Sequence, residues 1–113
     1  MSDCLFCKIV AGEIPADIVA RDTGFVAFRD IAPKAPVHLL VVPERHVESI
    51  AQIGALTEQE RADLGPFIAA VAPAAGLDEQ GYRVTTNCGP DALQAVFHLH
   101  WHVMGGAVLS SSM

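Results

Sequence analysis

The start of the chain combines one helical pattern with two strand-like patterns of apolar residues. In residues 4–10 the apolar positions recur at helical spacing, which predicts a short amphipathic helix that ends at Gly12. Residues 18–20 and 25–28 are apolar runs of strand length. Because residues 21–24 between them have turn composition, we expect the two runs to form a β-hairpin.

The middle of the chain predicts one further strand and the main helix. Residues 37–42 form a continuous apolar run of strand length. Thr57 followed by Glu60 is a capping-box signature, and apolar residues continue from there at helical spacing towards Gly76. We expect this helix to cover the sheet and Pro66 to kink or split it.

The last part of the chain predicts two more strands. Residues 81–86 alternate weakly, residues 87–91 have turn composition, and residues 96–104 form an apolar run that a Gly-Gly pair closes. With the helices, these strands indicate an α+β fold built on a five-stranded antiparallel sheet. Since there are no repeats, low-complexity linkers or shifts in composition, we expect residues 1–113 to be a single domain.

Composition limits the classes of function. Hydrophobic residues make up 51% of the 113 residues and charged residues 18%, which favours an oligomer that covers apolar surface. The net charge of -6, without a basic stripe or tail, argues against general binding to nucleic acid or to an anionic membrane. No apolar stretch has the length of a membrane span, and the N-terminus lacks a signal-peptide pattern. We therefore expect a cytoplasmic protein.

Three of the five histidines, His98, His100 and His102, fall within the predicted strand 96–104. Side chains of a strand alternate between faces, so the three imidazoles should share one face and the intervening residues the other. Three imidazoles in a small volume cannot all be protonated, and a neutral imidazole is a competent nucleophile towards phosphorus or an acyl carbon. The alternatives are a metal site built from this strand and a fortuitous cluster.

The histidine run resembles a family signature. Residues 98–104 are similar to the pattern His-φ-His-φ-His-φ-φ, with φ apolar, of the histidine triad (HIT) superfamily. Further segments resemble successive landmarks of its Hint-like branch, the histidine triad nucleotide-binding proteins: residues 4–9, 13–15, 28–33, 35–38, 43–46 and 105–106. The resemblance extends from Cys4 to about Leu109, and all five histidines fall on positions where that branch has histidines.

This resemblance implies an activity. Hint-like proteins are nucleotidyl hydrolases or transferases, and the chain looks like a purine nucleoside phosphoramidase that acts on adenosine phosphoramidates or aminoacyl-adenylates through a nucleotidyl-histidine. By position, His100 is the nucleophile that attacks the α-phosphorus, and His102 contacts the phosphate and the leaving group. His38 and His98 match the histidines that support this geometry. No organic cofactor is implied.

The resemblance also implies a pocket for the nucleotide. Four apolar residues match the positions that sandwich the purine base: Phe6, Ile9, Phe28 and Ile31. Four polar residues match a ribose-binding carboxylate, a position beside the base and two positions near the phosphate: Asp30, Arg29, Asn87 and Gln94, respectively. Taken singly, the apolar residues also fit core packing and Asp30 a capping role. Their joint occurrence favours binding.

Two positions depart from the pattern of the branch. Ala95 stands where many Hint-like proteins have a serine that contacts the phosphate or the leaving group. Leu93 stands where a glycine is common, so the phosphate loop is expected to have a different shape. The preference for a leaving group therefore stays open.

The three cysteines, Cys4, Cys7 and Cys88, are too few for a disulfide framework and suit a reducing compartment. The pair Cys4-x-x-Cys7 is half of a tetrahedral zinc site. Resemblance to bacterial relatives with this pair implies that His46 and His98 complete a structural zinc site, which pins the N-terminal helix to the histidine strand without joining the chemistry. The alternative is that the cysteines are small buried apolar residues, and Cys88 is expected to bind no metal.

Partners and competing functions complete the expectations. The family implies a homodimer in which two five-stranded sheets join, with a purine nucleotide as the substrate. One alternative is a dinucleoside polyphosphate hydrolase of the Fhit branch, which the closing Gly-Gly and the short chain disfavour. Another is a nucleotide-binding or scaffold protein with incidental catalysis, which Ala95 favours. The choice between adenine and guanine is open.

Overall fold

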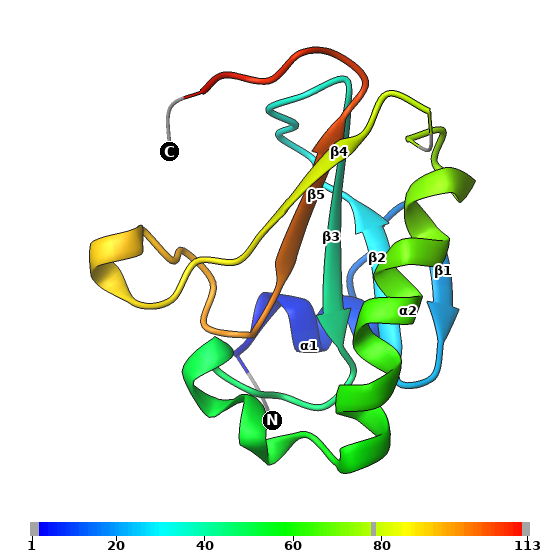
Figure 1. Cartoon of the computed structure of the whole chain (residues 1–113). Helices are drawn as coiled ribbons and strands as arrows, with labels where there is room; N and C mark the ends of the chain where they lie inside the picture. Colours follow the sequence, from blue (N-terminus) through cyan, green and yellow to red (C-terminus); the bar gives the residue numbers. More distant parts are fainter. Residues whose placement is uncertain (1–2, 78, 112–113) are drawn as a thin grey trace.

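One antiparallel sheet organises the chain. The computed structural model describes residues 3–77 and 79–111, and in these residues five strands lie side by side in the order β1-β2-β3-β5-β4 (Figure 1). The strands are β1 (Ile18–Asp22), β2 (Phe25–Arg29), β3 (Val37–Pro43), β4 (Tyr82–Thr85) and β5 (Trp101–Gly105). The helices are α1 (Leu5–Val10) and α2 (Glu58–Ala74), with 3₁₀ turns η1 (Ile50–Ala55) and η2 (Pro90–Ala92). The predicted α+β fold with a five-stranded antiparallel sheet is confirmed.

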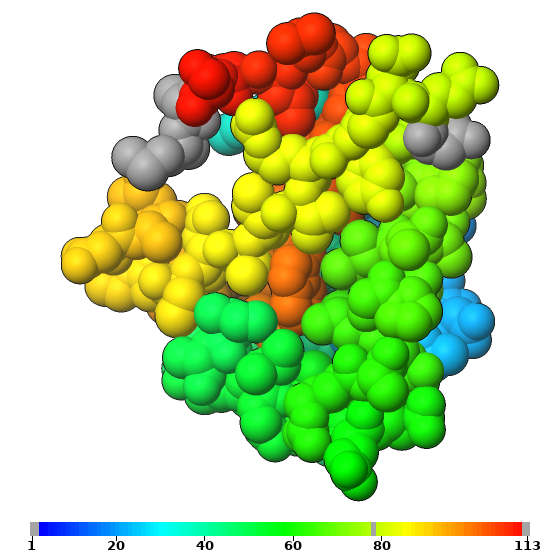
Figure 2. All heavy atoms as spheres, viewed as in Figure 1, coloured from blue at the N-terminus to red at the C-terminus, as the bar shows by residue number. Residues whose placement is uncertain are grey.

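The two helices cover opposite faces of the sheet (Figure 1). On one face Phe67, Ile68, Val71 and Ala72 of α2 pack against alternate strand residues such as Phe25. The remaining strand residues, such as Val26, pack on the other face against Phe6 and Ile9 of α1. Because β2 and β3 are covered on both sides, nearly all their residues are buried, which accounts for their continuous apolar sequence. Figure 2 shows α2 spread over the first face, with β4 at the surface beside it.

The strand that carries the histidines is shorter than residues 96–104. β5 begins at Trp101, so of the three clustered histidines only His102 lies in it. The ladder between β3 and β5 ends at the pair Val41–Trp101, and the next pairing would need an N–H from Pro43. The N–H of Leu99 donates instead to the carbonyl of Val47, over 2.6 Å. The prediction of a strand over residues 96–100 was therefore wrong.

The hairpin has a tighter turn than residues 21–24 suggest. Arg21 and Asp22 pair with Val26 and Phe25 across β1 and β2. This leaves Thr23 and Gly24 as a two-residue turn, in which both φ angles are positive, 53° and 88°. Such a turn matches the twist of the flanking strands, so the polar residues before it stay in the ladder.

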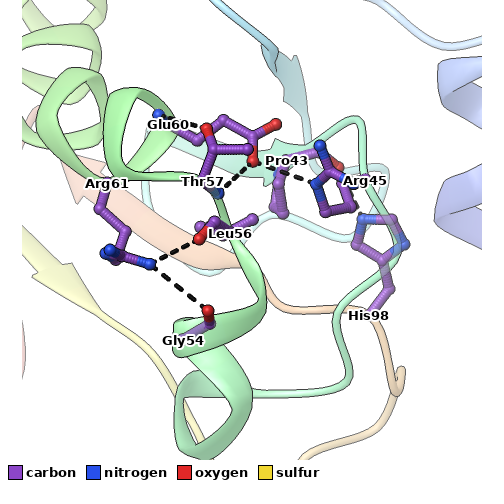
Figure 3. Close-up of polar contacts among 8 residues, drawn as sticks. All are labelled: Pro43, Arg45, Gly54, Leu56, Thr57, Glu60, Arg61 and His98. Carbon is purple, nitrogen blue, oxygen red and sulfur yellow. Dashed lines mark hydrogen bonds and ion pairs between the residues drawn. The ribbon is translucent and has the colours of Figure 1, made fainter.

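The capping box predicted for the main helix is confirmed. The Thr57 hydroxyl accepts the Glu60 N–H over 3.0 Å, and Glu60 Oε1 accepts the Thr57 N–H over 2.7 Å. The same Oε1 accepts from Arg45 Nε over 3.0 Å, which ties the segment after β3 to the start of α2 (Figure 3). Pro66 does not split the helix, because both Pro66 and Ala62, whose carbonyl loses its partner, lie on the exposed face.

Within residues 3–77 and 79–111, no helix combines the length and the apolar character that crossing a bilayer requires. The longest helix, α2, presents only one of its sides to the core and carries Glu58 and Glu60 in its first turn.

Candidate active site

The three clustered histidines share the face of the sheet that α1 covers. The rings of His98 and His100 meet the ring of Phe6 edge-on, with centroids 6.0 and 5.1 Å away. The rings of His100 and His102 are neighbours, with centroids 5.1 Å apart. The intervening residues pack into the core on the α2 side: Leu99, Trp101 and Val103. The predicted alternation of faces is confirmed, although only His102 belongs to β5.

Main-chain carbonyls determine the tautomers of His98 and His100. The Nε2–H of His98 donates to the Pro43 carbonyl, and the Nδ1–H of His100 donates to the His98 carbonyl, each over 2.8 Å. Because a carbonyl only accepts hydrogen bonds, these two nitrogens carry the ring protons. In the neutral rings, Nδ1 of His98 and Nε2 of His100 therefore hold the lone pairs. Both residues are buried, with exposed fractions of 0% and 7%.

A main-chain amide orders the neighbouring pair, His38 and His102. The Lys34 N–H donates to Nδ1 of His38 over 3.1 Å, so the proton of that ring is on Nε2. Nε2 of His38 lies 2.9 Å from Nδ1 of His102 and 3.5 Å from Oδ2 of Asp30. The shorter contact assigns a lone pair to Nδ1 of His102 and, in the neutral ring, a proton to its Nε2. His102 thus offers an N–H donor beside the lone pair of His100.

Burial keeps three of these rings uncharged at neutral pH. Burial, with smaller contributions from His100 and His38, lowers the pKa of His102 to about 4. Burial is also the largest cause of the lowered pKa values of His38 and His98. The Asp30 charge opposes the shift at His38, and the hydrogen bond to Pro43 opposes it at His98. The expected repulsion between clustered imidazoles is thus avoided by keeping them neutral.

One group of donor atoms suits a metal ion. The ligand atoms of Cys4, Cys7, His46 and His98 all lie within 4.8 Å of one another. Nδ1 of His98 is 3.4 Å from each cysteine sulfur, and Nδ1 of His46 is 3.3 Å from Cys7 Sγ. Two ligands of a tetrahedral zinc ion are separated by about 3.5 Å. His98 fits the role because its Nε2–H is bound to Pro43 and its lone pair on Nδ1 faces the sulfurs.

A second group of donor atoms, from Asp30, His38 and His102, also lies within 4.8 Å but suits a chain of hydrogen bonds better than a metal ion. A metal bound at Nε2 of His38 would place the ring proton on Nδ1. That proton would face the Lys34 N–H, another donor, over 3.1 Å. The hydrogen bonds of this group therefore favour a chain of donors that runs from Lys34 through His38 to His102.

Most of the apolar residues expected around the base come together next to His100. Phe6, Ile9 and Phe28 belong to one buried cluster, and the rings of Phe6 and Phe28 meet edge-on at 5.5 Å. Ile31 is different, because it is 98% exposed in the loop after β2. Asp30 begins this loop, where its Oδ1 accepts the Ala32 N–H over 2.9 Å and its Oδ2 faces His38.

The three other polar residues expected to contact the nucleotide differ in their exposure and in their hydrogen-bond partners. Arg29 is exposed and pairs with Asp17 over 3.3 Å. Asn87 is half-buried in the loop after β4. Gln94 is buried, and its amide shapes this loop by accepting from Gly89 N–H and donating to the carbonyls of Glu48 and Val96. Contacts of these residues with a nucleotide stay predictions.

The two departures from the family pattern lie in the same loop. Leu93 has a φ of 62°, in the left-handed region that favours glycine, and its side chain is 83% exposed. The loop thus keeps at this position a backbone conformation suited to glycine, at some cost in strain. Ala95 is exposed and brings no hydroxyl group to the loop.

Sequence reasoning missed the groups that orient the imidazoles. They are the N–H of Lys34 and the carbonyls of Pro43 and His98. Main-chain carbonyls occur in every residue and main-chain N–H groups in every residue except proline, so no pattern of side chains reveals which of them orient the imidazoles. The one available signal was Pro43, whose missing N–H ends the ladder next to the histidines.

Known proteins resemble the chain over nearly its whole length. A sequence model of the HIT domain family matches residues 11–108. An uncharacterized HIT-like protein of Synechococcus elongatus is 46% identical over 111 residues, covering 96% of this chain and 94% of that protein. The purine nucleoside phosphoramidase of Escherichia coli is 37% identical over 107 residues, 95% of this chain and 90% of that enzyme. The solved structure of a HIT family hydrolase from Clostridium thermocellum has a TM-score of 0.91 at 39% identity, covering 100% of this chain and 98% of that one.

The low pKa of His102 predicts that acid destabilises the fold. The unfolded state binds a proton near pH 6.5 and the folded state only near pH 4, so this contribution to stability is complete above pH 6.5 and is lost as the pH falls towards 4. Between pH 7 and 4.5 we expect the free energy of unfolding to fall by about 2 kcal/mol more in the wild type than in His102→Gln. Urea unfolding of both proteins in chelator measures this difference. Equal losses in the two proteins would contradict the assignment.

Proposed function

The chain belongs to the HIT domain family, and from this premise we propose that it is a purine nucleoside phosphoramidase. It cleaves the P–N bond of adenosine phosphoramidates, or releases adenylate from aminoacyl-adenylates, through a nucleotidyl-histidine intermediate. The observation that carries the proposal is the hydrogen bond from His100 Nδ1–H to the His98 carbonyl, which leaves the lone pair of His100 on Nε2. A lone pair held in a fixed direction is what attack on phosphorus requires.

The reaction proceeds in two displacements. In the first, Nε2 of His100 forms a bond to the α-phosphorus while the P–N bond to the leaving amine breaks. His102, with its N–H donor beside His100, stabilises the charge on the phosphate side by hydrogen bonding, and the departing nitrogen takes its proton from solvent. In the second, water attacks the phosphorus of the nucleotidyl-histidine and loses a proton to solvent, while the P–N bond to His100 breaks; this releases the nucleoside monophosphate and restores the lone pair on Nε2.

The apolar cluster next to His100 supports a purine nucleotide as the substrate. Phe6, Ile9 and Phe28 supply flat apolar walls of the kind that a purine base needs. Asp30 supplies a carboxylate for the ribose hydroxyls at the edge of this cluster. Recognition of the base and the sugar does not select the group attached to the phosphate. The leaving group is therefore set by the choice of substrate in the test below.

A comparison of the wild type with His100→Asn tests the catalytic proposal. With an adenosine phosphoramidate as substrate, we expect the wild type to release AMP and the variant to lose turnover by roughly a thousandfold or more. Asparagine retains a polar side chain of smaller size, so the variant should still bind AMP in calorimetry. Equal turnover in the two proteins would refute the role of His100. Binding without turnover in the wild type would favour a nucleotide-binding protein with incidental catalysis.

We also propose that Cys4, Cys7, His46 and His98 hold a structural zinc ion. The two thiolates and two imidazoles are a donor set that zinc prefers, and the lone pair on Nδ1 of His98 already faces the sulfurs. When bound, the ion would cross-link α1 to the segment after β3, which carries His46, and to the segment before β5, which carries His98. It would supply no open coordination position, because four protein ligands fill a tetrahedral site.

Elemental analysis measures the zinc content directly. Protein purified without chelator should contain close to one zinc per chain, and Cys7→Ser should contain far less. Cys88→Ser is the matched control, because Cys88 is exposed and outside the donor set, and it should match the wild type. Wild-type protein that purifies without zinc and takes up none on addition would contradict the site.

The odd number of cysteines supports a reducing, cytoplasmic location, which we propose for the protein.

A homodimer formed through β4 is the third part of the proposal. β1 and β4 are the edges of the sheet. β1 ends in exposed Arg21 and Asp22, charges that discourage edge-to-edge pairing, whereas β4 presents Tyr82 and Val84, each 39% exposed. Pairing of β4 with a second copy would extend the sheet and cover these apolar side chains.

Light scattering at micromolar concentration tests the dimer. We expect the mass of two chains for the wild type and of one chain for Val84→Lys, because a lysine on each edge places like charges in the interface. Ile18→Lys is the matched control, since Ile18 is a 41% exposed apolar residue on the opposite edge. A monomeric wild type, or dissociation only in Ile18→Lys, would contradict pairing through β4.

A further inference from the structure

His98 takes part in two arrangements at once. Its ring lies among the donor atoms of the candidate metal site, with Nδ1 at 3.4 Å from the sulfurs of Cys4 and Cys7. Its main-chain carbonyl accepts the Nδ1–H of His100 over 2.8 Å. The side chain and the main chain of one fully buried residue therefore connect the metal-binding group to the proposed nucleophile.

Phe6 makes a second connection between the same two groups. It lies in α1, a helix of six residues that is too short to be stable without outside support. Cys4 caps this helix through its sulfur, which accepts the Cys7 N–H over 3.3 Å, so both cysteines belong to its first turn. The Phe6 ring projects from that turn onto the rings of His98 and His100. Whatever holds the two sulfurs in place also holds Phe6 against His100.

We propose that Cys4, Cys7 and His46 are positioning residues of the active site. Through a shared zinc ion they hold His98 and Phe6, and these two residues hold the His100 ring in the tautomer that has its lone pair on Nε2. This inference rests on the proposed function and deepens it. It also differs from the expectation of a zinc site that stays apart from the chemistry.

The physical reason is the number of restraints on His98. With the ion bound, its ring is fixed at both nitrogens, by the metal at Nδ1 and by the Pro43 carbonyl at Nε2. Without the ion, Nδ1 has no bond of comparable strength, and the residue can shift together with the carbonyl that orients His100. A His100 ring released from this carbonyl exchanges between tautomers, and the tautomer protonated on Nε2 cannot attack phosphorus.

The test compares zinc-loaded wild type, wild type stripped by chelator and then reloaded, and Cys4→Ser. Serine is a good N-cap, so this variant removes the thiolate while α1 keeps a capping oxygen. We expect loss of metal by either route to lower kcat for AMP release roughly tenfold or more and to weaken AMP binding about fivefold. The imidazole N–H proton resonance of His100 should be sharp with zinc and broadened by solvent exchange without it. Zinc should restore all three properties in stripped wild type and not in Cys4→Ser.

Cys88→Ser is the control for the removal of a thiol, and it should behave like the wild type in each measurement. The inference is overturned if stripped wild type keeps the sharp His100 resonance and its AMP affinity, or if the protein takes up no zinc. If zinc-loaded wild type releases no AMP but its His100 resonance and AMP affinity respond to zinc as described, the proposed function fails and the positioning role stands.

Discussion

Hydrogen bonds between main-chain groups and imidazole rings are the constraint on which the rest of this site depends. Each ring has two nitrogens of opposite character, and which one carries the proton decides whether it donates, accepts or attacks. Carbonyls hold the protons of His98 and His100, and the Lys34 amide fixes His38, which in turn fixes His102. Burial keeps His38, His98 and His102 neutral, so these assignments persist at physiological pH.

The fold supplies these main-chain groups by ending a strand early. Pro43 cannot donate to the ladder, so β3 and β5 separate after the pair Val41–Trp101. The carbonyls of Pro43 and His98, just beyond this point, are then available to accept from the imidazoles of His98 and His100. Side-chain alternation nevertheless continues through the irregular segment, so the three imidazoles keep one face. One of the three clustered histidines thus lies in the strand and two lie in the loop before it, and these two are the proposed metal ligand His98 and the proposed nucleophile His100.

The sequence allowed the architecture to be predicted, and with the family resemblance also the grouping of the histidines with Phe6, Ile9 and Phe28, but not the hydrogen bonds that order the imidazoles. Apolar runs and helical patterns identified most of the elements. His46 and His98 were placed beside the pair Cys4-x-x-Cys7 only with the help of a family resemblance. The start of β5, the two-residue turn at Thr23 and Gly24 and the continuity of α2 past Pro66 were missed, because each depends on which main-chain groups find partners. Gln94 shows the same limit, since its amide proved to be engaged by the main chain of its own loop and of Glu48.

The most direct test of the central claim is the ¹⁵N NMR spectrum of the histidine rings in zinc-loaded wild type at neutral pH. Long-range ¹H–¹⁵N correlations report which nitrogen of each ring carries the proton. We predict protonated Nε2 in His38, His98 and His102, and protonated Nδ1 in His100. A His100 ring protonated on Nε2, or averaged between the two tautomers, would contradict the account, because no fixed lone pair would then face the substrate.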